Sequence, residues 1–198
     1  MSPSEVRPLR ADARRNRTRV LQAAQQAFAT EGLAVPLDEI ARLAGVGAGT
    51  VYRHFPTKEA LFEAVLVDRL EGLVEDARAA RGAADAGQAF YAFVTHLVSD
   101  ANTKKDLADA LAGAGVDLRT ATLQVAVDLN EELGGLLTRA QRAGAVHADV
   151  DLADLHALVM GALAAERQRA DPDRPGRITA LIWDGLRPTP ATGGAEGA

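Results

Sequence analysis

Apolar residues recur every three or four positions along most of this chain, which is the spacing of helices that bury one face. No segment shows the strict alternation of a half-buried strand. The spacing therefore predicts an all-α fold of about nine helices. Their predicted ranges are residues 10–30, 37–44, 48–55, 57–78, 88–101, 104–111, 117–142, 152–169 and 177–186.

Residues that start or stop helices stand at the ends of these segments. Gly32 and Gly45 follow the first two helices, where glycine can adopt the left-handed conformation that ends a helix. Pro36 precedes the second helix, at a position where its missing N–H costs no hydrogen bond. Thr57 can cap the start of the fourth helix. The second and third helices are therefore separated only by a tight turn at residues 45–47.

Composition narrows the class of protein. The chain of 198 residues is 47% apolar but only 4% aromatic, so its core is expected to consist mainly of Ala, Leu and Val. The absence of cysteine excludes disulfides and thiolate metal sites. No apolar run reaches the roughly 18 residues of a membrane span, and the N-terminus lacks the apolar stretch of a signal peptide. We therefore expect no membrane partner and a cytoplasmic location.

The net charge of −5 is distributed unevenly along the chain. Residues 1–58 carry nine Arg or Lys and five Asp or Glu, a net charge of +4, whereas the remainder carries 13 and 22, a net charge of −9. A basic N-terminal part on an acidic body is typical of nucleic-acid-binding proteins. A solvated basic arm is the alternative interpretation of the charge alone.

The stretch GVGAGT at residues 45–50 has glycine at every second position, as some phosphate-binding loops do. A dinucleotide-binding fingerprint needs a strand before its glycines, but the preceding residues LDEIARLA have a helical period. A Walker P-loop ends in Gly-Lys-Ser/Thr, whereas Gly49 is followed here by Thr50 and Val51. Two short helices joined by a tight turn with glycine instead indicate a helix-turn-helix, which would span residues 37–55.

The segment IARLAGVGAGTVYRHFPTKEALFEAV, from residue 40 to residue 65, resembles the DNA-binding signature of the TetR-type repressors. A dozen spaced positions match that signature: Ile40, Ala41, Ala44, Gly45, Val46, Gly49, Tyr52, His54, Phe55, Lys58, Glu59 and Leu61. The resemblance covers about residues 10–70, and the rest of the chain matches the family only in the number and length of its helices. It implies an N-terminal three-helix DNA-binding head with a helix-turn-helix, followed by a helical domain for ligand binding and dimerisation.

The resemblance and the helix breaks together predict five parts of the chain. They are a flexible basic arm (residues 1–9), a DNA-binding domain (10–56), a connecting fourth helix (57–79), a ligand-binding and dimerisation domain (86–187) and a disordered tail (188–198). Prolines disfavour a helix in the arm, and glycine and proline are frequent in the tail.

The resemblance also implies which residues contact DNA. They are Arg14, Arg17, Gly47, Ala48, Thr50, Tyr52, Arg53, His54 and Lys58. Tyr52, His54 and Lys58 are expected to contact phosphates and to seat the third helix. Taken alone, His54 would more often be a packed histidine than a contact residue.

The remaining members of this set have different expected roles. Ala48 and Thr50 stand at the start of the third helix, where a methyl group or a hydroxyl can meet base edges. Arg14 and Arg17 are expected to contact phosphates or the minor groove. Arg53 has the reach of a contact residue, and a solvated arginine is the alternative.

Two positions depart from the family pattern. Gly47 stands where the family usually has Ser or Thr, whose hydroxyl caps the third helix and touches a phosphate. Pro36 stands where Thr commonly caps the second helix. Because both changes remove hydrogen bonds, we expect Arg14 and Arg17 to compensate with contacts to phosphates.

For the C-terminal part, the resemblance implies a small-molecule effector and a homodimer formed by the last two helices. Polar or aromatic residues on apolar helices are the candidates for the ligand pocket: Phe90, Phe93, His96, Thr122, Asp128 and His156. Apolar residues of the last two helices are the candidates for the dimer contact: Leu155, Val159, Leu163, Ile178, Leu181, Ile182 and Trp183. Locally satisfied polar groups and ordinary core packing are the alternative explanations.

The sequence contains no nucleophile elbow, phosphate loop or metal-binding histidine–glutamate set, so we expect no enzyme, no cofactor and no metal. The implied function is a transcriptional repressor whose homodimer binds a palindromic operator in double-stranded DNA and is released by a small molecule. A small-molecule-binding or scaffold α-protein with a non-functional DNA-binding head is the alternative. An activator would differ only in the position of its operator.

Overall fold

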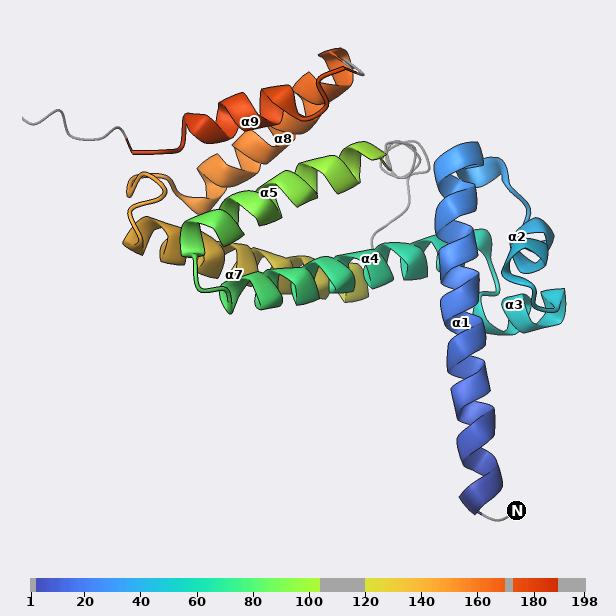
Figure 1. Ribbon diagram of the computed structural model, residues 1–198. Helices are drawn as coiled ribbons and strands as arrows, with labels where there is room; N and C mark the ends of the chain where they lie inside the picture. The colour runs from blue at the N-terminus through green and yellow to red at the C-terminus, as the bar shows by residue number, and fades with distance from the viewer. Residues whose placement is uncertain (1–2, 104–119, 170–172, 189–198) are drawn as a thin grey trace, which may run out of the picture. The chain divides into compact units, whose positions relative to one another are not determined.

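The computed structural model describes residues 3–103, 120–169 and 173–188, and every regular element in these ranges is a helix (Figure 1). The elements are α1 (Pro3–Glu31), the 3-10 helix η1 (Gly32–Ala34), α2 (Leu37–Ala44), α3 (Ala48–His54), α4 (Lys58–Arg81), α5 (Ala86–Thr103), α7 (Thr120–Arg142), α8 (Leu152–Arg169) and α9 (Arg177–Asp184). The predicted helix at 104–111, the start of the predicted helix at 117–142 and almost all of the predicted tail lie outside the described residues.

Most helices agree closely with the predicted ranges, and α2 and α8 have the predicted bounds. The exception is α1, which begins at Pro3, so the predicted start of the first helix near Arg10 is wrong. Pro3 occupies the first helical position, where its missing N–H leaves no bond unmade.

The chain divides into two packing units. The first unit takes its described residues from 1–74 and 104–128, and the second from 75–103 and 129–198. Two helices, α4 and α7, therefore contribute residues to both units. The first unit extends well beyond residue 56, the predicted end of the DNA-binding domain.

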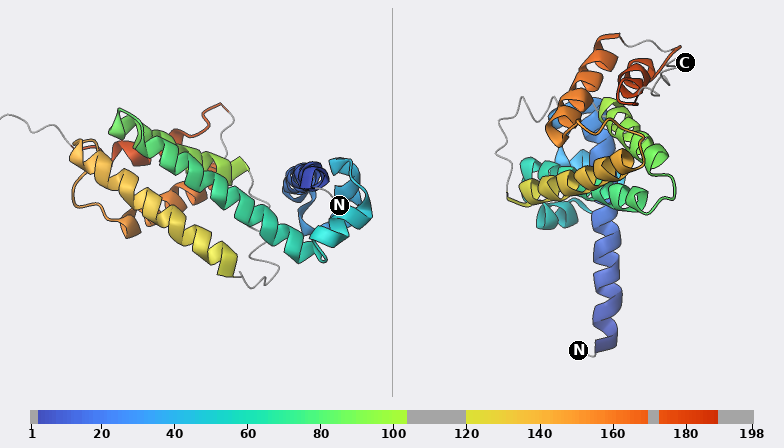
Figure 2. Two further views of the ribbon diagram at one scale, coloured as in Figure 1. Left: turned by 90° about the horizontal axis from the view of Figure 1, so that it is seen from below. Right: turned by 90° about the vertical axis from the view of Figure 1, so that its left-hand side faces the viewer.

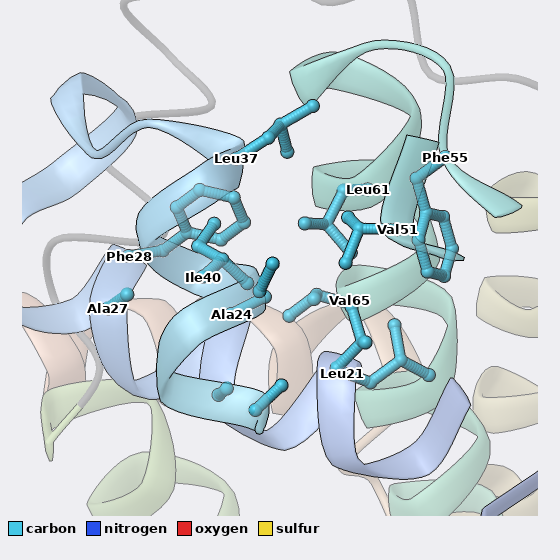
Figure 3. Close-up of a cluster of buried hydrophobic side chains, with 14 of the residues drawn as sticks. Leu21, Ala24, Ala27, Phe28, Leu37, Ile40, Val51, Phe55, Leu61 and Val65 are labelled. Atoms are coloured by element: carbon cyan, nitrogen blue, oxygen red, sulfur yellow. The ribbon is translucent and has the colours of Figure 1, made fainter. Parts of the chain in front are cut away.

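The core of the first unit is built from α1, α2, the residues around α3, and the first turns of α4 (Figure 3). Phe28 of α1 and Phe62 of α4 are fully buried, and their rings meet edge to face with centroids 5.5 Å apart. Leu61 and Val65 of α4 lie in the same cluster, at 0% and 2% exposure. Burial of each large apolar side chain contributes roughly 1.5–3 kcal/mol. The start of α4 is therefore part of the core that supports α2 and α3.

The turn between α2 and α3 is closed by backbone hydrogen bonds. Gly45 has φ 62° and ψ 41°, which confirms the predicted left-handed conformation, and its N–H donates to carbonyls in the last turn of α2. The N–H of Val46 donates to the carbonyl oxygen of Ala41 at 3.0 Å, and the Val46 side chain packs against the core. Gly47 has an extended backbone, with φ −68° and ψ 140°, and precedes α3 without a side-chain cap.

In the second unit, α5, α8 and α9 pack against one another, as the green, orange and red helices of Figure 2 show. Their buried side chains join those of the second half of α7 in a core that includes Phe90, Leu155 and Trp183. Gly87 allows the start of α5 to approach the loop after α7, because a Cβ at this position would lie 2.6 Å from the Cβ of Ala145.

The end of α4 is bonded to α7 by a group of ionic contacts that we call the Glu132 bridge. Glu132 of α7 accepts hydrogen bonds from Arg78 Nε at 3.1 Å and from Arg81 Nη1 at 2.7 Å, and its side chain is 14% exposed. Gly135 leaves room for the Arg81 guanidinium, since a Cβ there would lie 2.9 Å from Arg81 Cζ. Arg139 donates to the carbonyl oxygen of Arg81 and so caps the C-terminus of α4.

Replacement of Gly47 by serine is expected to stabilise the first unit. The backbone angles of Gly47 suit any residue, a Cβ would meet no atom within 4 Å, and a hydroxyl can cap α3. The expected gain in the free energy of unfolding is about 0.5–1 kcal/mol, from the cap and from the stiffer unfolded chain. Thermal and urea unfolding of Gly47→Ser would measure it.

Gly45→Ser is the matched control, with the same substitution two positions earlier. A left-handed conformation costs a non-glycine residue about 1–2 kcal/mol, and the new Cβ would lie 2.5 Å from Arg19 Nη2. This variant should therefore unfold at lower temperature than the wild type. Equal effects of the two substitutions would contradict the assignment of Gly47 as a vacant cap position.

Replacement of Glu132 by glutamine is expected to weaken the second unit in a pH-dependent way. The hydrogen bond from Arg81 is the main cause that lowers the pKa of the Glu132 carboxyl, with Arg78 adding to it. A lowered pKa in the folded state stabilises the protein above the ordinary value of 4.5, and this stabilisation is lost as the pH falls through the lowered pKa. We expect Glu132→Gln to cost about 1–2 kcal/mol at neutral pH and almost nothing in acid.

The adjacent exposed Glu131 provides the control for this measurement, because Glu131→Gln removes the same charge from the same helix. Thermal unfolding from pH 7 down to acid should separate wild type from Glu132→Gln only at the upper end, and leave Glu131→Gln close to wild type throughout. A constant difference between wild type and Glu132→Gln at all pH values would rule out the ionic contribution.

Candidate nucleic-acid interface

One side of α3 is buried and the other is exposed. Val51 is fully buried, and Phe55, which directly follows the helix, is 4% exposed. Thr50 is half-buried. The exposed residues of the turn and the helix are Gly47, Ala48, Gly49, Tyr52, Arg53 and His54. The structure therefore brings the predicted contact residues of α3 together on one accessible surface.

Tyr52 contacts α2 as well as solvent. The residue is 46% exposed, and its hydroxyl lies beside the carboxylate of Asp38, whose negative charge raises the pKa of that hydroxyl. The hydroxyl therefore remains protonated at neutral pH. A DNA phosphate at this position would compete with Asp38 for the same proton.

Two exposed arginines on this surface differ in their bonding. Arg53 Nε donates to the carbonyl oxygen of Gly49 at 3.1 Å, and its terminal nitrogens have no acceptor among the described residues. Arg42 of α2 donates from Nε and Nη2 to the two carboxylate oxygens of Glu39, at 2.8 and 2.5 Å. The guanidinium of Arg42 is thus paired with a carboxylate within α2, while that of Arg53 has no carboxylate partner among the described residues.

Arg14 and Arg17 both lie on the exposed side of α1. The Arg17 guanidinium carbon lies 5.9 Å from the centre of the Phe55 ring, which places this cation next to the end of α3. Arg14 lies about one turn closer to the N-terminus of α1. The two arginines therefore extend the basic surface from α3 along α1.

Lys58, which is expected to contact a phosphate, forms its hydrogen bonds within the protein. Its Nζ donates to the carbonyl oxygen of Leu33 at 2.7 Å and approaches that of Ala34 at 3.5 Å. Lys58 therefore ties the first turn of α4 to η1. This bond is made within the protein, so a phosphate would have to replace or share it.

Arg19 was not identified as a functional residue from the sequence. Its Nη2 donates to the carbonyl oxygen of Gly45 at 3.1 Å, which joins the middle of α1 to the turn before α3. The acceptor is a backbone atom 26 residues away, so no side-chain pattern could have indicated it. Arg19 is a candidate for holding the helix-turn-helix in position.

His54 is exposed, with its ring centre 6.2 Å from that of Phe55. The alternative interpretation of a histidine packed in the core therefore does not describe it. Exposure at the end of α3 is compatible with the expected phosphate contact.

The predicted pocket residues lie in different environments. Phe90 and Phe93 are buried in the core of the second unit. His96 is exposed, with Nε2 3.7 Å from a carboxylate oxygen of Asp76, and His156 is exposed, with Nε2 2.9 Å from Asn130 Oδ1. These histidines correspond to the alternative of locally satisfied polar groups.

The other two pocket candidates belong to the first unit. Thr122 is 3% exposed, and its hydroxyl has no hydrogen-bond partner among the described residues. Asp128 accepts a hydrogen bond from Gln124 at 3.2 Å, one turn earlier on the same helix.

A groove of about 600 Å³ lies elsewhere in the second unit, along the first half of α5. It is lined by Asp85, Gly87, Gln88, Tyr91, Ala92, Thr95, Ala145 and Arg187. The Tyr91 hydroxyl donates to the carbonyl oxygen of Ala145 at 2.9 Å, and the Arg187 guanidinium lies 4.3 Å from the Tyr91 ring centre. None of the predicted pocket residues lines this groove, whose walls come from α5 and from Asp85, Ala145 and Arg187 outside the helices.

The predicted dimer residues divide into buried and accessible ones. Leu155 and Trp183 are 0% and 3% exposed, so they pack inside the chain and are not available at its surface. Val159, Leu163, Ile178 and Ile182 are half-buried. Leu181 of α9 is 54% exposed, and Met160 of α8, which the sequence did not single out, is 66% exposed. Exposed apolar side chains therefore remain on α8 and α9, at Met160 and Leu181.

None of the helices in the described ranges is long and apolar enough to cross a membrane.

Solved structures include relatives that match most of this chain. A TetR transcription regulatory protein from Mycobacterium vanbaalenii is 48% identical over 91% of this chain and 100% of its own, with a TM-score of 0.76. The TetR transcriptional regulator SCO0520 from Streptomyces coelicolor is 33% identical over 88% of this chain and 99% of its own, with a TM-score of 0.71.

Curated proteins match over a shorter region. The uncharacterized HTH-type transcriptional regulator TtgW from Pseudomonas putida is 40% identical over 72 residues, which are 36% of this chain and 54% of TtgW. The matched region covers 34% of SrpR, another regulator from Pseudomonas putida. The chain thus spans about half or less of the length of the curated relatives it matches.

Two family models match the chain in succession. The model of the bacterial regulatory proteins of the tetR family matches residues 20–65, which include α2, α3 and the start of α4. The model of the C-terminal domain of SbtR-like transcriptional regulators matches residues 85–188, more than half of the chain. These matches, the exposed helix-turn-helix and the full-length structural relatives show that the chain belongs to the TetR family of bacterial transcriptional regulators.

Proposed function

We propose that this regulator is a repressor that binds a palindromic operator as a homodimer and is released by a small molecule bound in its C-terminal part. The observation that carries the proposal is the surface of α3. Val51 and Phe55 secure the helix to the core, while Tyr52 and Arg53 remain exposed and Arg17 of α1 lies next to Phe55. The donors on this surface suit phosphates and base edges, and no enzymatic chemistry is part of the proposal.

In the proposed complex, α3 enters the major groove and the surrounding residues contact the DNA backbone. Tyr52, His54, Arg14 and Arg17 would bind phosphates, which fix the orientation of the protein on the duplex. Lys58 and Arg19 would act from behind this surface by holding η1 and the turn before α3. The rigid core beneath α3 means that little order has to be gained when DNA binds.

The DNA geometry requires two copies of the head. Successive major grooves on one side of a duplex are about 34–36 Å apart, so a palindromic operator is bound by a two-fold symmetric dimer. The accessible apolar residues of α8 and α9, above all Leu181 and Met160, are the proposed dimer surface. A dimer formed by the second units would present two first units to the operator.

Release by a small molecule is proposed to act through α4. This helix contributes Leu61 and Phe62 to the core of the first unit and is bonded to α7 of the second unit by the Glu132 bridge. A ligand that favours one position of α4 would shift the population toward heads that do not fit the operator. The groove along α5 is the candidate effector site, since its volume of about 600 Å³ suits a small organic molecule.

A gel-shift experiment with the DNA around the gene of this protein tests the proposal. Binding by the folded dimer at low salt, competed by the same unlabelled DNA, is the expected result. Absence of binding by a folded dimer would favour a scaffold or small-molecule-binding protein with a non-functional head. The repressor is proposed to act in the cytoplasm, where this DNA is located.

Alanine at Arg14 or Arg17 is expected to weaken operator binding and to reduce its dependence on salt. Each phosphate contact that is lost should lower the slope of log affinity against log salt by about 1. Arg19→Ala provides the contrast, because it should weaken binding by loosening the turn at Gly45 while leaving the slope unchanged. Fluorescence anisotropy at several salt concentrations measures all three. Unchanged slopes for both Arg14→Ala and Arg17→Ala would contradict their contact with phosphates.

A charge at Leu181 is expected to separate the dimer. Leu181→Glu places a carboxylate on the proposed contact surface, where its desolvation would be unfavourable. Light scattering should then give the mass of the single 20.8 kDa chain and not twice that mass. Leu123→Glu is the control, because Leu123 is similarly exposed, at 56%, but lies on α7. A Leu181→Glu protein that retains the dimer mass would exclude this surface.

A further inference from the structure

We propose that Arg53 selects a guanine in the operator and is the main residue of this chain that recognises a base. The inference rests on the proposed DNA-binding function and deepens it by naming a base that the protein recognises. It follows from the side chains that α3 exposes and from the hydrogen bonds that those side chains already make.

Few groups at the start of α3 can bond to a base edge. Ala48 carries only a methyl group, and Gly47 and Gly49 carry no side chain. A Cβ added at either glycine would meet no atom within 4 Å, so the backbone here has open space for close approach to DNA. The side chain that supplies specificity must therefore come from further along the helix.

The other polar residues of α3 are less suited to this role. Thr50 is half-buried and has a short side chain. The Tyr52 hydroxyl lies beside Asp38, which competes for its proton. His54 is the last residue of α3, whereas the N-terminal part of a recognition helix contacts the bases.

The side chain of Arg53 extends back toward that N-terminal part. Its Nε donates to the carbonyl oxygen of Gly49, one turn earlier, at 3.1 Å. Long side chains in helices usually point in this direction. The bond to Gly49 restricts the planar guanidinium and leaves Nη1 and Nη2 without an acceptor among the described residues. The guanidinium is thus positioned before DNA arrives, which lowers the entropy cost of a contact.

Two parallel N–H donors match the O6 and N7 acceptors of guanine in the major groove. Adenine presents a donor at N6 in place of O6, so it cannot accept both bonds. Arg42 of α2, another arginine on this surface, donates from Nε and Nη2 to the carboxylate of Glu39, which holds its guanidinium against its own helix and compensates its charge. Guanine recognition by Arg53 therefore needs no rearrangement of the protein.

Selection from a pool of randomised duplex DNA with the full-length protein is the first step of the test. The expected half-site contains one invariant G·C pair. Replacement of this pair by A·T should lower the affinity of the wild type by roughly 5-fold to 150-fold, the range of a bidentate arginine–guanine contact. Replacement of the guanine by 7-deazaguanine, which lacks the N7 acceptor, should also lower it.

Arg53→Ala and Arg53→Gln are the test variants, and Arg42→Ala is the matched control that removes the same charge from the neighbouring helix. Circular dichroism and thermal unfolding establish that the variants fold. In both Arg53 variants, the preference for G·C over A·T and the effect of 7-deazaguanine should disappear. Arg42→Ala should retain both, whatever its effect on overall affinity. A double-mutant cycle between residue and base then isolates the contact.

The outcomes distinguish this inference from the function on which it rests. No enrichment of any sequence by the folded protein would overturn the DNA-binding proposal and the inference together. Enrichment of a half-site whose G·C preference survives in Arg53→Ala would retain the function and overturn the role of Arg53. An equal loss of affinity of Arg53→Ala for all sequences, with a salt slope reduced by about 1, would show that Arg53 contacts a phosphate. That result would also overturn its role in recognising a base.

Discussion

The edge-to-face contact between Phe28 of α1 and Phe62 of α4 closes the core on which the helix-turn-helix rests. The short helices α2 and α3 bury few large side chains of their own, so their positions depend on the apolar surface beneath them. Leu61 and Val65 extend that surface along α4. The first turns of α4 therefore belong to the core that supports α3, and a displacement of these turns would disturb the exposed surface that we assign to DNA.

Some cationic side chains of this protein donate hydrogen bonds to backbone carbonyls, while others are exposed to solvent. Arg19 binds the carbonyl of Gly45, Lys58 that of Leu33, and Arg139 that of Arg81. Each of these carbonyls lies at or near the end of a helical segment, where carbonyl groups lack helical partners and carry the negative end of the helix dipole. Part of the positive charge of the N-terminal segment therefore holds the fold together, and only the remainder is free for phosphates.

The helices and the DNA-binding motif were predictable because their signals are local. The apolar period gave the bounds of α2 and α8, and Gly45 and Thr57 marked helix ends by their own conformational preferences, with the Thr57 hydroxyl accepting from the N–H of Ala60 at 3.1 Å. The helical start of α1 was not predictable in this way, because prolines near the N-terminus disfavour a helix in general, although Pro3 is compatible with a first helical position.

Features that depend on distant backbone atoms were not predictable. The contact of Arg19 with Gly45 and the groove beside Tyr91 arise from segments that meet only in the folded chain. The apolar pattern of the last two helices also did not distinguish buried from exposed residues. Leu155 and Trp183 are buried in the core, whereas Leu181 is exposed. A helical period identifies an apolar face, but it does not indicate whether that face meets the same chain or another molecule.

Because α4 contributes residues to both packing units, the position of the junction matters when parts are exchanged between regulators of this kind. The helix is continuous from Lys58 to Arg81, with its first turns in one core and its last residues bonded to α7. A head cut out at residue 56 would leave Phe28 facing water. A hybrid that places this head on a foreign effector domain would have to carry the helix as far as Val74, the last residue of α4 in the first unit, and join the new domain within a helical turn. The junction would then have to preserve helical phase as well as sequence.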